Sequence, residues 1–419
     1  MKKTLLFFLA AMIALSAVFA GGSSESSAAA PAAEKKNEIT VVYLDEKPWH
    51  DQADEFTAAT GIKVNYINVP FPELRQRSLT SFLSQDSHFD VIHLRSDYVH
   101  EFASKEFLEP LDDLLTAEEK AAYNKTSLDN LSFGGHLYGL PRYYWLWQFN
   151  YNTQILKEAG VEKIPETWDE LIAITPQIKA AGHEVMIAGL DDEIITYMFY
   201  VLLNCEGTTL IDEKGMPVCN NEAGARALDT LKRLVDSEAI SKHSFEIHGS
   251  NPASDMFCQG DFAFCFASPA TYSLAMNPAS SRIVGMVETA VVPKGSVGSA
   301  SWNEPAGLGI PYNAPNKEGA IEYIKFCTTA EQQKKVAMQI CRVSTHPEVN
   351  SDPEILAKYP QFSSINNQLE YPSGIVNSIH AMEVLDTTAE LLHKHLDGTL
   401  NTADTLKAIE KALTEIAQQ

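Results

Sequence analysis

Aromatic and acidic side chains are the residues of this sequence best suited to hold a ligand. Six aromatic residues fall between Tyr143 and Tyr151, an enrichment that suits a β-strand and is costly to expose to water. A small polar molecule offers groups that need polar partners and apolar faces that pack on aromatic rings. A site for such a molecule therefore combines both kinds of side chain.

The sequence contains none of the short motifs that mark common hydrolases. The sequence contains no H-E-x-x-H, no G-x-S-x-G and no cysteine and histidine at a recognisable catalytic spacing. A secreted carbohydrate hydrolase remains an alternative, because the paired carboxylates of glycosidases have no short motif. The residues favour capture of a ligand over chemical change.

Composition and charge restrict the class of partner. The chain has 32 basic and 55 acidic residues, a net charge of −23, with 45% hydrophobic and 21% charged residues. These proportions are ordinary for a soluble globular protein. Nucleic acid is excluded as an expected partner, because so acidic a chain lacks the basic face that phosphates require.

The amino-terminal segment predicts export. Residues 1–20 combine two lysines with a short apolar run and small residues where a signal peptidase can cut. Residues 21–37 are rich in Gly, Ser, Ala and Pro and are expected to form a flexible linker. Roughly 380 residues remain, which suits two domains better than one compact core.

All six cysteines lie in the second half of the chain, and none forms a CxxC pair. Cys205 and Cys219 flank a hairpin-like segment, so a disulfide between them is one possibility. Small buried thiols that pack as hydrophobic groups are the other, particularly for Cys265 and Cys327.

Strands and helices alternate at the start of the folded part. A strand at 39–44, a polar loop at 45–51 and a helix that ends at Gly61 come first, followed by a strand at 62–69, a helix at 73–84 and a strand at 89–94. This order predicts a parallel sheet, whose ligands bind beyond the carboxyl ends of the strands. The loops at 45–50 and 95–98 are therefore candidate ligand loops.

Helices are expected later at 181–205 and 223–238, with a strand at 262–267 and a helix that begins at Ser268 and Pro269. The segment GLPRYYWLWQFNYN and the following P-x-T-W-x-E-L resemble the part of family 1 extracellular solute-binding proteins that leaves the first lobe. The spacing of Phe257, Gly260 and Ala263, the segment MVETAVVPKG and the segment AGLGIPYNAPNKEGAIEYIKF are similar to later parts of that family, in the same order. The resemblance is to the maltose and multiple-sugar type and covers nearly all of 39–419.

This resemblance implies an α/β fold of the two-lobed periplasmic binding protein kind. Each lobe is expected to be a mostly parallel sheet flanked by helices, and a multi-strand hinge joins the lobes. Residues 38–143 and 292–328 are assigned to lobe 1, and 144–291 and 329–419 to lobe 2. Hinge crossings are expected near 142–148, 287–293 and 327–331, where dihedral changes let the lobes close on a ligand.

The function implied by the resemblance is that of a monomeric periplasmic receptor. It would capture a sugar, oligosaccharide or polyol and deliver it to the permease of an ABC transporter, without a cofactor or a metal ion. Many members of the family carry a lipid-anchoring cysteine after the signal, but Gly21 and Gly22 stand there instead.

Candidate ligand contacts follow from the layout that the resemblance implies. They are Asp45, Glu46, Trp49, Arg95, Asp97, Tyr143, Trp145, Tyr272, Trp302, Glu304, Asn377 and His380. Trp302 is the strongest single candidate, because its loop-forming flanks have little ability to bury it. Arg95 and Arg142 suit either an acidic ligand or a structural ion pair.

Two departures from the maltose-binding members argue against the same specificity: Leu94 replaces a tryptophan, and Trp145 stands near the place of a ligand carboxylate. A metal-ion receptor of related fold is a further alternative, since Tyr143 and Tyr144 resemble the adjacent tyrosines of ferric-ion receptors. His393 and His395 also carry ligand-type side chains. Solvent exposure on a polar helix is the plainer interpretation of these two histidines.

Overall fold

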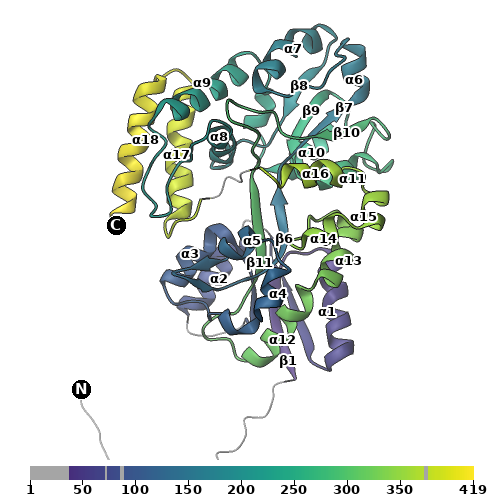
Figure 1. Cartoon of the computed structure of the whole chain (residues 1–419), viewed down its shortest axis with the longest axis vertical. Coiled ribbons are helices and arrows are strands. Elements are labelled where there is room, and N and C mark those ends of the chain that lie inside the picture. The colour runs from purple at the N-terminus through teal and green to yellow at the C-terminus, as the bar shows by residue number, and fades with distance from the viewer. Residues whose placement is uncertain (1–36, 71–72, 85–88, 372–375) are drawn as a thin grey trace, which may run out of the picture. The chain divides into compact units, whose positions relative to one another are not determined.

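The computed structural model describes residues 37–70, 73–84, 89–371 and 376–419. The expected export signal, and all of the expected linker except Asn37, lie outside the described residues. Two mixed β-sheets organise the described chain, and helices flank both sheets (Figure 1).

The first sheet contains the alternating segment that the sequence predicts. β1 pairs in parallel with β2 and β3, and β11 joins β3 to β6 by antiparallel pairing. The predicted parallel arrangement of the first three strands is therefore confirmed. In spatial order the strands are β2 (Lys63–Asn68), β1 (Glu38–Tyr43), β3 (Val91–Arg95), β11 (Asn303–Gly309) and β6 (Leu140–Leu146).

The second sheet is built mainly from later parts of the chain. β7 pairs antiparallel with β10 and β9, whereas β8 is parallel to β9. The expectation of a mostly parallel sheet is therefore wrong here, because only the pairing of β8 with β9 is parallel. The order is β10 (Val287–Ala290), β7 (Gln148–Asn152), β9 (Phe262–Ala267) and β8 (Glu184–Ile187). A short hairpin of β4 (Ser132–Phe133) and β5 (His136–Leu137) lies outside both sheets.

The aromatic run from Tyr143 to Tyr151 forms two strands, so the expectation of a single strand is wrong. Strand β6 ends in the first sheet and β7 begins in the second. Between them, the backbone N–H of Trp147 donates to the carbonyl oxygen of Trp302 at 2.9 Å. The chain thus passes from one sheet to the other at Trp147, next to the residue that precedes β11.

Helices that lie far apart in the sequence pack together on the first sheet. In Figure 1 the purple helix α1 lies beside the green helices α12 and α13, in agreement with their contacts. The helices of this part are α1 (Lys47–Thr60), α2 (Leu74–Leu83), α3 (Ser96–Ser104), α4 (Ala117–Ala121), α5 (Lys125–Asp129), α12 (Lys317–Cys327) and α13 (Ala330–Ile340).

The yellow carboxyl-terminal helices α17 and α18 pack against α8 and α9 beside the second sheet (Figure 1). Helices here are α6 (Thr153–Glu158), α7 (Trp168–Ala180), α8 (Ile194–Cys205), α9 (Glu222–Asp236), α10 (Ser250–Phe257), α11 (Ala270–Ala275), α17 (Ala381–Leu396) and α18 (Thr402–Ala417). Three short helices precede α17, namely α14 (Pro347–Asn350), α15 (Pro353–Lys358) and α16 (Phe362–Gln368). Two 3-10 turns occupy Asp112–Leu114 and Lys242–Phe245.

Two boundaries differ from the sequence-based expectation. Helix α1 begins at Lys47 with Pro48 in its first turn, so the predicted polar loop at 45–51 is mostly helical. Its predicted end at Gly61, which has φ of 78°, is confirmed. The segment 181–205 is not one helix, because the four-residue strand β8 precedes α8.

Two large hydrophobic clusters form the cores of the two sheets, one around β1, β3 and β11 and one around β7, β9 and α8. All six cysteines are buried free thiols. The possible disulfide between Cys205 and Cys219 is therefore not formed, and both side chains pack in the second cluster. Within the described ranges, no helix has the length and apolar character needed to cross a membrane.

Candidate functional site

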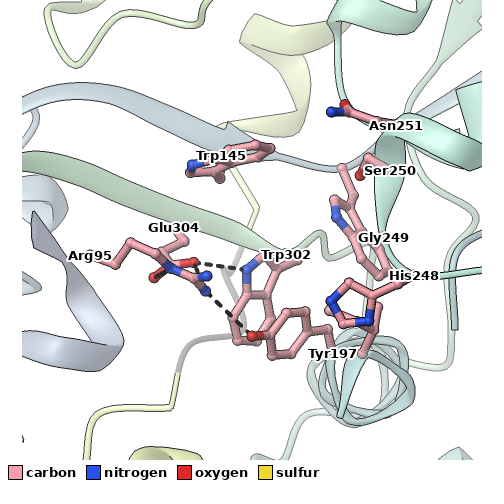
Figure 2. Close-up of a pocket in the computed structure, with 11 residues that line it drawn as sticks. Arg95, Trp145, Tyr197, His248, Gly249, Ser250, Asn251, Trp302 and Glu304 are labelled. Atoms are coloured by element: carbon pink, nitrogen blue, oxygen red, sulfur yellow. Dashed lines mark hydrogen bonds and ion pairs between the residues drawn. The ribbon is translucent and has the colours of Figure 1, made fainter. Parts of the chain in front are cut away.

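A cavity of about 150 Å³ brings together residues of the first sheet, Trp147 between the two sheets, the turn before α10, and helices α8 and α10. Figure 2 shows Arg95 and Glu304 at one end, His248 to Asn251 at the other, and Trp145, Tyr197 and Trp302 between them. Its lining residues are Arg95, Trp145, Trp147, Ile194, Tyr197, His248, Gly249, Ser250, Asn251, Trp302 and Glu304. Aromatic walls with polar ends are the composition expected of a small-molecule site.

Arg95 and Glu304 form a two-pronged ion pair at the buried end. The Arg95 Nε donates to Glu304 Oε1 at 3.0 Å, and Nη2 donates to Oε2 at 2.8 Å. Nη2 also lies 2.8 Å from Asp97 Oδ2 and donates to the hydroxyl of Tyr197 at 3.3 Å. The Ser96 hydroxyl donates to Glu304 at 3.0 Å. Charge-assisted bonds of this geometry fix both side chains.

Strand register explains why these residues meet. Arg95 is the last residue of β3 and pairs with Ala306 of β11, and Glu304 lies two residues earlier on β11. Side chains two residues apart on a strand share a face. Glu304 also pairs with Trp145 of β6 on its other side. The neighbouring strands β3, β11 and β6 therefore present Arg95, Glu304 and Trp145 to one cavity.

Burial and neighbouring charges shift the pKa values of Asp97 and Arg95. Removal from water, and then the negative charge of Glu304, hold the pKa of Asp97 well above its ordinary value, although Arg95 opposes the shift. Burial alone would lower the pKa of Arg95, but Asp97 and Glu304 raise it well above the usual range. Arg95 is consequently always charged, and a structural ion pair is the role that the structure assigns to it.

Trp302 lines the cavity, but it is only 2% exposed. Its indole stacks on Tyr197 with ring centroids 4.0 Å apart, and Tyr200 meets it edge-on at 5.8 Å. Its Nε1 donates to Glu304 Oε2 at 3.3 Å. The expectation that its loop leaves Trp302 unburied is therefore wrong, because two tyrosines of α8 cover the ring.

Trp145 is half-buried and lines the same cavity. In Figure 2 it lies across the space from Trp302 and Tyr197. The guanidinium carbon of Arg342 lies 5.0 Å from its ring centroid and 5.1 Å from that of Tyr143. Such cation–π contacts hold the indole in place. Of the two predicted aromatic contacts that line the cavity, Trp145 is more exposed than Trp302.

Three further predicted residues form a cluster beside the cavity. Glu46 pairs with Arg342 at 2.5 Å and accepts from the indole N–H of Trp49 at 2.9 Å. Trp49 is fully buried and stacks on Tyr143 with ring centroids 5.7 Å apart. Arg342 thereby connects this cluster to Trp145, while none of Glu46, Trp49 and Tyr143 lines the cavity itself.

Arg142 lies deeper in the same region. Its guanidinium sits 3.9 Å from the ring centroid of Trp49 and 4.6 Å from that of Tyr43, and it donates to the side-chain oxygen of Gln52. Burial would lower its pKa, but neighbouring groups, Tyr43 first among them, raise it above the usual range. Arg142 is 2% exposed and packs as part of the core.

The open end of the cavity is the turn from His248 into α10. The Nδ1 of His248 lies 3.0 Å from Asp191 Oδ1, and its Nε2 lies 3.9 Å from Glu193 Oε1. Gly189 permits this contact, since a Cβ at that position would lie 2.1 Å from the carbonyl oxygen of Gly249. Two backbone segments therefore approach each other closely and carry His248 and Asp191 together.

Four predicted residues lie away from the cavity. Asp45 is exposed and pairs with His50 at 3.0 Å. Tyr272 lines a separate surface hollow of about 540 Å³ with Glu288 and Gln361. Asn377 donates to Asn130 at 3.0 Å, and His380 precedes α17 with Glu383 at 3.9 Å.

The residues behind the metal-receptor alternative do not converge. Tyr143 belongs to the core of the first sheet, whereas Tyr144 packs in a different cluster with Val343. His393 contacts the ring of Phe245. His395 is buried beside the carbonyl oxygen of Leu400, so the expected solvent exposure is wrong for this residue.

Several cavity residues were not among the predicted contacts. They are Trp147, Ile194, Tyr197, His248, Gly249, Ser250 and Asn251. Trp147 belongs to the aromatic run, so the sequence could have identified it as a candidate contact. Tyr197 lies in a helix that is apolar on all sides, so nothing local separates it from core residues.

A sequence profile described as bacterial extracellular solute-binding protein matches residues 32–334. The chain is 23% identical to a probable ABC transporter-binding protein of Deinococcus radiodurans over 386 residues, covering 87% of this chain and 89% of the relative. It is 24% identical to the mannitol-binding protein of Pseudomonas aeruginosa over 277 residues, which cover 63% of this chain and 62% of that relative.

Among solved structures, the maltose-bound MalE3 of T. maritima superposes with a TM-score of 0.82. The two sequences are 24% identical, and the match covers 90% of this chain and 99% of the other. The likeness extends over both sheets and confirms the two-lobed α/β fold that the sequence predicts.

Proposed function

Because this chain belongs to the bacterial extracellular solute-binding protein family, we propose that it captures a carbohydrate or polyol and delivers it to an ABC transporter permease. The observation that carries the proposal is the cavity with aromatic walls and polar ends. The similarity of this chain to a mannitol-binding protein supports a polyhydroxylated ligand.

Each part of the cavity has a role in capture. Trp145 offers a ring to the C–H face of a sugar, and the hydroxyl of Tyr197 and the carboxylate of Glu304 provide hydrogen-bond partners for hydroxyl groups. Ser250 and Asn251 add the amino-terminal turn of α10, whose backbone N–H groups are unsatisfied within the helix.

Binding without chemical change is the second part of the proposal. Glu304 receives hydrogen bonds from Arg95, Ser96 and Trp302, so the carboxylate is fixed as an acceptor. A hydrolase would instead need one carboxylate free to act as a nucleophile or as the base for a water molecule, and one protonated carboxyl group free to act as the acid. The arrangement supports a receptor over the secreted hydrolase.

Capture is proposed to involve closure of two lobes about the predicted crossings at 142–148, 287–293 and 327–331. The passage of the chain between the two sheets at Trp147 supports the first of these positions. The lobes would then comprise 38–143 with 292–328, and 144–291 with 329–419. An exported, monomeric receptor in the periplasm completes the proposal.

A panel of sugars and polyols screened by thermal shift and then by calorimetry tests the function. A ligand at about 100 times its dissociation constant adds ~2.7 kcal/mol to stability. Trp145→Ala should weaken binding of the selected ligand by ~1 kcal/mol or more, whereas Tyr312→Ala, a partly exposed aromatic outside the cavity, should not. If no panel member binds, the carbohydrate assignment fails.

A further inference from the structure

Negative charge surrounds the cavity at both ends. Glu304 lines it directly, and Asp97 lies against Arg95. At the other end, Asp191 and Glu193 flank His248. Even with Asp97 neutral and His248 protonated, carboxylates outnumber cationic side chains around the cavity.

Arg95 is the one guanidinium among the described residues that line the cavity, and it is already engaged. Arg95 meets Glu304 through two hydrogen bonds and Asp97 through a contact of 2.8 Å. An anionic ligand would have to compete for this group with the buried carboxylate of Glu304 and with the contact to Asp97. Breaking a buried ion pair leaves an uncompensated charge and is strongly unfavourable.

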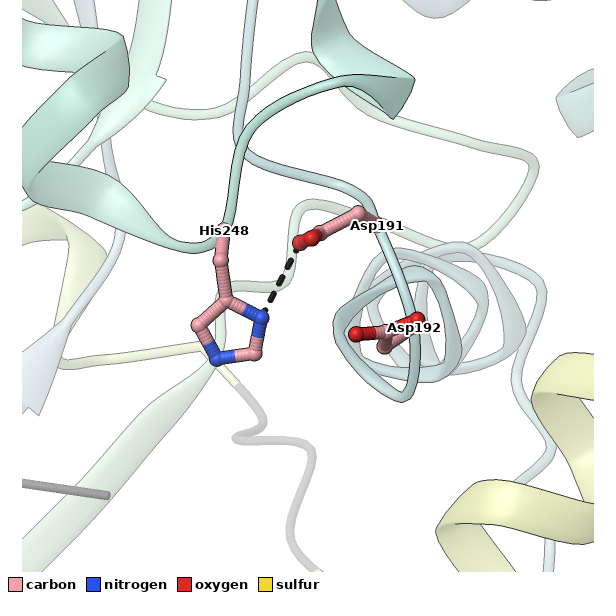
Figure 3. A group of neighbouring side chains, drawn as sticks. All are labelled: Asp191, Asp192 and His248. Atoms are coloured by element: carbon pink, nitrogen blue, oxygen red, sulfur yellow. Dashed lines mark ion pairs between the residues drawn. The ribbon is translucent and has the colours of Figure 1, made fainter.

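The open end concentrates acidic groups beside one histidine. Figure 3 shows Asp191, Asp192 and His248, whose ligand atoms all lie within 4.8 Å of one another. Asp191 and Asp192 do not line the cavity, but they lie beside His248, which does. Their charge therefore acts at this end of the cavity, most strongly at low ionic strength.

The aromatic walls also favour a positive group. A cation within about 6 Å of a tryptophan or tyrosine ring is attracted by the ring's negative face. Trp145, Trp147 and Tyr197 all line the cavity. Its volume of about 150 Å³ matches that of an engineered cavity of ~150 Å³ that takes one benzene molecule, so it suits one six-membered ring.

We propose that the ligand is a single sugar unit that carries a positively charged amino group, bound with its ring on Trp145 and its ammonium toward the His248 end. This inference rests on the proposed function and adds the size and the charge of the ligand. It also predicts discrimination against acidic sugars, because their carboxylate or phosphate would face the same field.

Matched sugars test the charge requirement directly. The full mature chain is titrated with a hexose, the corresponding 2-amino-2-deoxyhexose, its N-acetylated form and the corresponding hexuronate, in the gluco, galacto and manno configurations. At least one amino sugar should bind tenfold or more tightly than its neutral counterparts, and no hexuronate should bind better than its hexose. This preference should shrink as salt concentration rises.

A double variant locates the charge that is responsible. Asp191→Asn with Asp192→Asn should lower the ratio of amino-sugar affinity to neutral-hexose affinity, both measured on the same variant, at least threefold. The matched control is Glu213→Gln with Glu415→Gln, which removes the same charge from two exposed positions and should leave the preference intact.

The outcomes separate this inference from the function on which it rests. Equal binding of neutral and amino sugars overturns the charge requirement but leaves the receptor function standing. Tighter binding of a disaccharide than of any single sugar overturns the proposed ligand size and also leaves the receptor function standing. Failure of every sugar, combined with binding of a small quaternary ammonium compound, overturns both. If Ca²⁺ or Zn²⁺ alone binds wild type but not the Asp191 and Asp192 double variant, the cluster is a metal site and the inference is wrong.

Discussion

The Arg95 end of the cavity is buried and its charges are paired, whereas the His248 end is partly exposed and carries excess negative charge. Glu304 and Asp97 have side chains that are 1% exposed, against 43% for His248 and 26% for Asp191. Paired charges in a buried site stabilise one geometry and are costly to disturb. Partly exposed charges cost little and can set selectivity through their field.

The largest effect on stability is expected at the buried end, from Trp302→Ala. The substitution removes an indole that is covered by Tyr197 and Tyr200, and comparable truncations cost about 3–5 kcal/mol. Urea unfolding of the variant measures this loss. A loss below ~1 kcal/mol would mean that the indole is not part of the core, as its flanks alone suggest.

Glu304→Ala should cause the second largest loss of unfolding free energy. It leaves Arg95 buried with Asp97 as its remaining carboxylate partner, and removal of one partner from a buried ion pair costs ~3 kcal/mol or more. Glu415→Ala is the control, since its contact with Lys411 is exposed at 3.9 Å and such pairs contribute at most ~1 kcal/mol. Equal unfolding free energies for the two variants would contradict the contrast between buried and exposed charge.

Gly189→Ala probes how the open end is held. The new Cβ would lie 2.1 Å from the carbonyl oxygen of Gly249, so the backbone that carries His248 must move. Overpacking of this kind costs about 1–3 kcal/mol. Ligand affinity should also fall. Gly298→Ala controls for the effect of a methyl group, because its new Cβ would lie 3.9 Å from the ring of Tyr371, an ordinary contact distance. Unchanged affinity in Gly189→Ala would show that the position of His248 does not matter for binding.

The smallest predicted effect is a change in pH dependence. Because burial raises the pKa of Asp97, the folded protein binds a proton that the unfolded chain has released above about pH 4. This contribution is therefore complete below about pH 4 and is lost as pH rises through the folded pKa. Asp97→Asn should make stability less dependent on pH between about 4 and 8. A slope identical to that of wild type would show that Asp97 ionises normally.

Much of the fold follows from local sequence patterns. Alternating strands and helices predict β1, β2 and β3, and the apolar FAFCFA segment predicts β9. Errors arise where an element is short or its start signal is subtle. Strand β8 has only four residues, and Pro48 in the first turn of α1 is the signal that places Trp49 in a helix.

The candidate site is less accessible to sequence. Arg95, Trp145, Trp302 and Glu304 were predicted and meet in one cavity, because all four lie at or beside strands of the first sheet. Tyr197 and His248 could not be identified, since their place depends on how α8 and the turn before α10 pack. The burial of Trp302 has the same origin, because the rings that cover it come from α8.

A crystal structure of the protein with the tightest-binding sugar of the panel tests the central claim most directly. The proposal predicts one sugar ring on Trp145, between the Glu304 carboxylate and the turn at His248. A sugar bound instead in the separate hollow beside Tyr272, Glu288 and Gln361 would contradict it and would move the binding site to that surface.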